Sequence, residues 1–173
     1  MRAPVVALTV VSLVACGGDE GDVSAIVGDA GVFRVAPTQV VAVVQPDEQL
    51  EAHIRTVDVQ VRAGADGEAW ELRHNEVYDM QALAWPLLLA IVPAGGDASR
   101  GYQLSLEARD AAGELLVTRT ARSSFVQDAL LALPIRLVAS CQNRFACGDG
   151  LTCTADGCTG VAVDPRSLGS YAD

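Results

Sequence analysis

The side chains best able to do chemistry in this chain are its five cysteines, and their spacing divides them into two groups. Cys16 stands alone near the N-terminus. The other four lie within eighteen residues near the C-terminus: Cys141, Cys147, Cys153 and Cys158. A cysteine thiol can be acylated, oxidised to a disulfide or bound to zinc, and the surrounding sequence favours one of these outcomes over the others.

The segment before Cys16 has the organisation of a signal peptide. Arg2 supplies a positive start, and an apolar stretch of ten residues follows from Val5 to Val14. Such a stretch suits an export signal and is too short to cross a bilayer as a helix, which needs about 20 residues. We therefore predict that residues 1–15 are removed after export.

The end of this segment, Leu13-Val14-Ala15-Cys16, resembles the bacterial lipobox. The resemblance implies that the Cys16 thiol receives a diacylglyceryl group, that the chain is cut before Cys16, and that the bilayer is a partner of the mature chain. Two acyl chains or more would anchor the chain, since each buried CH₂ contributes about 0.8 kcal/mol. The alternatives are an ordinary secretory signal with an incidental Cys16, or a short anchor that is never cleaved.

Residues 16–30 are predicted to form an acidic, flexible tether. Gly17-Gly18-Asp19-Glu20-Gly21-Asp22 cannot continue a helix and has little to bury. In enterobacteria an Asp directly after the lipidated cysteine favours retention in the inner membrane. Gly17 stands there in this chain. The expected location is therefore the outer membrane of the cell envelope, facing the periplasm or the surface.

In an exported protein, the four C-terminal cysteines predict two disulfides within residues 140–160. Three connectivities are open, and we favour Cys141 with Cys153 and Cys147 with Cys158. The gaps of five, five and four residues are longer than the C-x2-4-C pairs of structural zinc sites. No C-x-x-C motif for thiol redox chemistry is present.

Residues 31–139 read as short strands, because apolar residues mostly recur at every second position. Clusters of Gly, Pro and Asp separate these runs. The expected fold is all-β, an antiparallel immunoglobulin-like sandwich with a small disulfide-rich appendage and an extended tail at 161–173. The predicted strands lie in seven or eight of the segments 31–35, 40–44, 57–62, 69–73, 87–92, 102–110, 114–119 and 131–138. A helix at Leu83–Ile91 is the alternative to one of them, although Pro86 disfavours both a regular helix there and a central strand position for itself.

We expect structural roles for the other residues whose side chains could take part in chemistry. Trp70 and Trp85 are predicted to anchor the sandwich core. His53 and His74 have no partner at metal spacing, so we expect surface histidines. The segment Glu76–Asp79 is expected to be a solvated loop rather than a calcium site.

The net charge of the chain is −10, and removing residues 1–15 takes away only Arg2, which gives −11. Such a surface repels phosphate backbones, so nucleic-acid binding is disfavoured. All twelve basic residues are Arg, which is typical of a GC-rich genome.

Taken together, these features resemble myxobacterial-type lipoproteins. The most specific parts of the resemblance are the Ala108–Gly113 hairpin and the cysteine-rich end. The resemblance supports the location and the fold, and it implies no activity, cofactor or catalytic residue.

The expected function is that of a non-catalytic, membrane-anchored lipoprotein with a binding, adhesion or accessory role toward a protein or an envelope polymer. No G-x-S-x-G, H-E-x-x-H or P-loop motif favours an enzyme. The alternatives are an envelope enzyme, which a pocket lined by His74, Glu76 or Asp79 would favour, and a calcium-binding module suggested by the Asp-Gly pairs.

Overall fold

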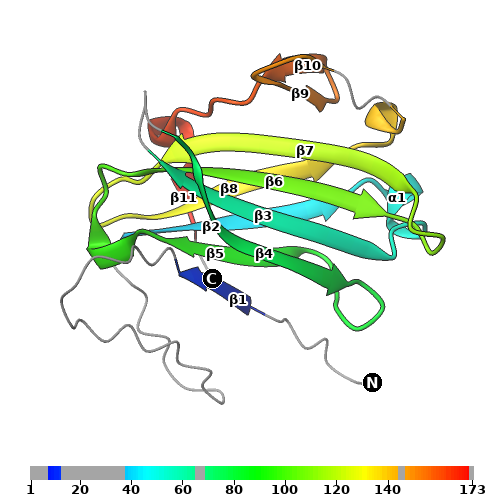
Figure 1. The fold of residues 1–173 in the computed structure, drawn as a ribbon, viewed down its shortest axis with the longest axis horizontal. Helices are drawn as coiled ribbons and strands as arrows, with labels where there is room; N and C mark the ends of the chain where they lie inside the picture. The colour runs from blue at the N-terminus through cyan, green and yellow to red at the C-terminus, as the bar shows by residue number, and fades with distance from the viewer. Residues whose placement is uncertain (1–7, 13–37, 65–68, 144–146, 172–173) are drawn as a thin grey trace.

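The computed structural model describes residues 8–12, 38–64, 69–143 and 147–171, and these form two stacked β-sheets (Figure 1). Cys16, the tether and the predicted strand Gly31–Val35 lie outside the described residues. Sheet A runs in the order β1-β5-β2-β8-β11, and sheet B in the order β4-β3-β6-β7. The expected all-β sandwich is therefore confirmed.

Sheet B is antiparallel throughout. Its strands are β3 (Thr56–Gly64), β4 (Glu71–Asp79), β6 (Gly101–Arg109) and β7 (Leu115–Ser124). In β3 and β6 buried residues alternate strictly with half-buried ones, as the period of two predicts. The β6–β7 hairpin turns at Gly113, which has a φ of 84°, and the Asp110 carboxylate accepts the N–H groups of Ala112 and Glu114.

Sheet A departs from a purely antiparallel arrangement. Its strands are β1 (Leu8–Ser12), β2 (Gln39–Pro46), β5 (Leu87–Val92), β8 (Leu130–Leu137) and β11 (Gly169–Ser170). β2 pairs antiparallel with β5 but parallel with β8 along its whole length, and β1 pairs parallel with β5. β2 and β8, the first and last long strands of the two-sheet sandwich, therefore lie side by side and run in the same direction.

The core between the sheets consists of aliphatic side chains from both inner faces together with one fully buried aromatic residue, Tyr102. Aromatics are few in this chain, so Val, Leu and Ile fill the space. The largest fully buried members are Val40, Leu50, Leu87, Leu89, Ile91, Leu104, Leu106, Leu133, Ile135 and Leu137.

Three short elements connect the strands, and a small hairpin follows β8. The connecting elements are helix α1 (Glu48–Glu51) and two 3-10 turns, Ala94–Gly96 and Ala139–Cys141. The hairpin consists of β9 (Leu151–Thr154) and β10 (Gly157–Gly160), and a third 3-10 turn, Pro165–Ser167, precedes β11. Pro86 follows Trp85 through a cis peptide bond and lies directly before β5, which agrees with its exclusion from a strand centre.

Two expectations were wrong. Glu76–Asp79 is the end of strand β4 and not a loop, because the side chain of Tyr78 alternates inward and is buried. Trp70 is not a core anchor. It lies half-buried over the backbone of sheet B, where Gly64 and Gly101 leave room for its ring. Trp85 is half-buried and packs against the core from its rim.

Candidate functional site

The C-terminal cysteines form two interlaced disulfides. Cys141 is joined to Cys153 and Cys147 to Cys158, with Cα–Cα distances of 5.8 and 5.4 Å. This is the pairing favoured from the sequence. The two bonds span 12 and 11 residues, and closing a loop of that size stabilises a fold by about 3 kcal/mol in the chain-entropy model. The bonds and the β9–β10 hairpin define a unit that we call the disulfide module, residues 141–143 and 147–160.

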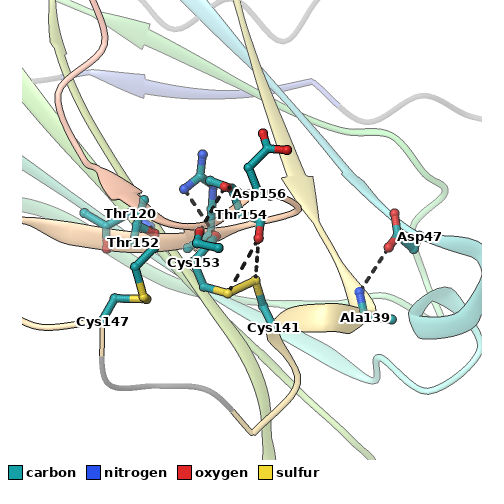
Figure 2. The surroundings of a disulfide bond; sticks show 12 residues. Asp47, Thr120, Ala139, Cys141, Cys147, Thr152, Cys153, Thr154 and Asp156 are labelled. Atoms are coloured by element: carbon teal, nitrogen blue, oxygen red, sulfur yellow. Dashed lines mark hydrogen bonds between the residues drawn. A yellow bond between two sulfur atoms is a disulfide. The ribbon is translucent and has the colours of Figure 1, made fainter.

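The first disulfide belongs to the core, and the second lies at its margin. Cys141 and Cys153 are 1% and 6% exposed and join the main apolar cluster, whereas Cys158 is exposed. Figure 2 shows the two buried sulfur atoms beside the carbonyl oxygen of Thr154, at 3.5 and 3.8 Å. Both bonds lie within the module; the buried one packs it against the sandwich core, and in the second Cys147 is half-buried against the same cluster.

Hydrogen bonds attach the module to β7, an edge strand of sheet B. The backbone N–H of Thr120 donates to the hydroxyl of Thr152 at 3.0 Å, and the Arg119 guanidinium donates to the carbonyl of Cys153 at 3.3 Å. Burial lowers the pKa of Arg119. The module thus satisfies polar groups of a strand edge that would otherwise be free to pair with another chain.

The segment after the module continues along β7 and then reaches sheet A. The N–H of Arg122 donates to the carbonyl of Val161, and the N–H of Val163 donates to the carbonyl of Arg122. Two residues of the tail, Gly169 and Ser170, then form β11 beside β8. The expected extended tail is accordingly laid against both sheets. In Figure 1 the β9–β10 hairpin lies above β7, and β11 lies beside β8.

A surface contact between Trp70 and Arg122 lies near the β7 end of sheet B. The guanidinium carbon of Arg122 is 4.7 Å from the centre of the Trp70 ring, which is cation–π geometry. Arg122 also donates to the side-chain oxygen of Gln103 at 2.8 Å, and Arg62 donates to the Trp70 carbonyl at 3.4 Å. Periodicity in the sequence gave no sign of this contact, because it joins residues from three different strands and a loop.

The polar groups considered for an enzyme or a calcium site lie along β4. The Tyr78 hydroxyl donates to Glu76 at 2.9 Å, and His74 Nε2 lies 3.3 Å from the same hydroxyl. Asp79 accepts a hydrogen bond from Arg55 at 3.1 Å. His74, Glu76 and Tyr78 therefore bond to one another along β4, whereas Asp79 pairs with Arg55 outside the strand.

A shallow hollow of about 530 Å³ lies elsewhere, at the end of the sandwich that carries α1. Its lining comes from α1, the α1–β3 connection and the β4–β5 connection: Glu48, Glu51, Ala52, Ile54, Met80, Leu83, Ala84 and Trp85. His74, Glu76 and Asp79 do not line it. His53 is exposed beside α1. Within the described ranges, no three His, Cys, Asp or Glu side chains come together in a way that could hold a metal ion.

In the part of the chain that the structure describes, no helix is long and apolar enough to cross a membrane. The class that the geometry defines is an all-β sandwich whose C-terminal disulfide module covers a strand edge. No family model, curated protein or solved structure matches this chain.

Proposed function

We propose that this protein is a bacterial envelope lipoprotein, anchored in the outer membrane through an acylated Cys16 and presenting a non-catalytic sandwich to a protein or polymer of the envelope. The proposal rests on the segment Leu13-Val14-Ala15-Cys16, which ends an apolar stretch and resembles the lipobox. The structure adds one supporting observation. Four of the five cysteines pair among themselves, so Cys16 is the one cysteine without a disulfide partner in the chain.

The two disulfides support the oxidising compartment that the proposal requires. An extracytoplasmic domain can form and keep such bonds, whereas reducing systems of the cytoplasm oppose them. An anchored domain of this kind also gains from covered strand edges, since lipoproteins concentrated on a membrane meet one another often. The disulfide module and β11 supply such cover on one side of the sandwich.

The binding role rests on the form of the domain. A sandwich of about 100 residues carries loops at both ends that suit partner recognition. The hollow beside α1 has two exposed carboxylates, Glu48 and Glu51, over an apolar floor that includes Ile54 and Met80. We place partner contacts at this end of the domain.

The test is to grow cells that express the full chain in the presence of radioactive palmitate and to measure the label in the purified protein. Wild-type protein is expected to take up label, and its mature mass is expected to begin at Cys16 with acyl groups attached. Cys16→Ser is expected to lose the label entirely, while Ser24→Ala, a change in the tether of similar size, keeps it. Label on the Cys16→Ser variant would refute the anchor, and density-gradient separation of the two membranes tests the outer-membrane assignment.

A further inference from the structure

The four long edge strands of the sandwich differ in what covers their outer sides. On one side, β7 is covered by the disulfide module and β8 is partly covered by β11. On the other side, β4 is an exposed edge of mostly polar and charged residues, and the register of the β3–β4 pair shifts at Val61/Arg62. Charge and irregularity are ordinary protection for a free edge.

The remaining edge, β5, has neither charge nor irregularity. Its six residues, Leu87–Val92, are all apolar, and five of them are buried. In the structure the outer side of β5 is paired with β1, in parallel register from Leu8 beside Leu88 to Ser12 beside Val92 (Figure 1). β1 lies inside the segment that the proposed function assigns to the signal peptide, so cleavage before Cys16 would remove this strand.

We propose that, in the mature protein, the outer edge of β5 is an acceptor site that the segment Gly31–Val35 of the same chain fills in place of β1. The proposal rests on the proposed function, since it requires loss of residues 1–15. A bare apolar edge of this length would otherwise be a template for aggregation.

Polarity favours this segment. β2 and β5 are antiparallel, with Val40 beside Ile91 and Val44 beside Leu87, so β2 begins next to the end of β5. A strand that lies outside β5 and leads into the start of β2 must therefore run in the direction of β5. That is the direction in which β1 runs.

The length of the connection also fits. A strand outside β5 is two strand spacings from β2, or about 10 Å. Ala36, Pro37 and Thr38 separate Val35 from Gln39, the first residue of β2, and four extended steps reach about 13 Å. Thr38 is held in place, because it is buried and its hydroxyl accepts the N–H of Asp128 at 3.0 Å.

Within Gly-Val-Phe-Arg-Val, the charged Arg34 alternates with the apolar Phe33 and Val35, as in a strand with one buried face. In such a strand Phe33 and Val35 would face the core and Arg34 would face the outer side of sheet A. An intramolecular strand acts at an effective concentration in the millimolar range, whereas two mature chains repel each other through a net charge of −11 each. The chain's own segment is therefore favoured over a second copy as the occupant.

The experiment is hydrogen–deuterium exchange on the mature lipoprotein purified in detergent, with intact mass measured on the same sample. Residues 31–35 and 87–92 are expected to be protected. The Phe33→Asp/Val35→Asp variant is expected to raise exchange in Leu87–Val92 by about tenfold or more while β2 and β8 stay protected. Val23→Asp/Ile26→Asp, which places the same charges in the tether, serves as the control and is expected to leave β5 unchanged.

Three outcomes would overturn the proposal. Rapid exchange at residues 31–35 in a cleaved and lipidated protein would overturn the strand assignment and leave the lipoprotein assignment standing. A dimer, seen by light scattering, whose β5 protection survives Phe33→Asp/Val35→Asp would assign the edge to a second copy. An intact mass that retains residues 1–15 would overturn both assignments, because β1 would then keep the edge.

Discussion

The guanidinium of Arg122 lies 4.7 Å from the centre of the Trp70 ring, and the same Trp70 ring lies against two glycines of neighbouring strands. A Cβ atom on Gly101 would come within 2.9 Å of the Trp70 ring, and one on Gly64 within 3.0 Å. The indole thus occupies space on one face of sheet B, and this space is open because Gly64 and Gly101 have no side chains.

The first prediction concerns this space. Gly101→Ala is expected to destabilise the fold by about 1–3 kcal/mol, since the added methyl group forces the indole or the nearby backbone to move. Trp70→Ala in the same chain should recover part of that loss. Urea unfolding of the two single variants and the double variant measures the coupling. Gly160→Ala, at a site with no atom within 4 Å of the new Cβ, is the control and should change stability little.

The second prediction separates the two disulfides. Cys147→Ala/Cys158→Ala is expected to cost about 3 kcal/mol, the value for a loop of this length. Cys141→Ala/Cys153→Ala should cost more, because it also opens a cavity in the core. Thermal or urea unfolding compares the two pairs. Equal losses would show that the buried sulfur atoms contribute nothing through packing.

The third prediction tests the attachment of the module. Thr152→Val keeps the shape of the side chain but removes the acceptor of the Thr120 N–H, and we expect a loss of about 1–3 kcal/mol. Exchange of the Thr120 amide should rise at the same time. Thr159→Val, which lies opposite Thr152 in the β9–β10 hairpin, is the matched control. A Thr120 amide that stays protected in Thr152→Val would contradict the role given to this hydroxyl.

The fourth prediction concerns alkaline pH. Burial raises the pKa of Tyr102 above its usual value of 10. The unfolded chain therefore loses this proton at lower pH than the folded chain does, and ionisation favours unfolding. The contribution of Tyr102 is fully present below pH 10 and falls as the pH rises beyond it. The stability difference between wild type and Tyr102→Phe, followed from pH 8 to 11, should move in favour of the Phe variant. A stability difference that stays constant from pH 8 to 11 would contradict this role of Tyr102.

Local pattern predicted the fold well where one face of a strand is buried. Val57, Val59 and Val61 alternate with polar residues, and all three are buried in β3. The hairpin at Gly113 was equally clear, because the turn needs a positive φ there. In these elements the side-chain period of two and the turn residue carry the information within a few neighbouring positions.

Relationships between distant segments were not accessible in this way. The parallel pairing of β2 with β8 joins residues about 90 positions apart, and no turn residue encodes it. The position of Trp70 on the outer face of sheet B depends on two glycines, Gly64 and Gly101, in two different strands. The second half of β4 was missed because it is an edge strand, where outward and inward positions are both largely polar.

The disulfide module and β11 also impose an order of events in time. Residues 141–171 are the last of the sandwich to be synthesised, yet they complete the edges of strands formed much earlier, β7 and β8. If the chain is exported N-terminus first, as proposed, the sandwich has one flank unfinished until residues 141–171 reach the oxidising compartment and their cysteines pair.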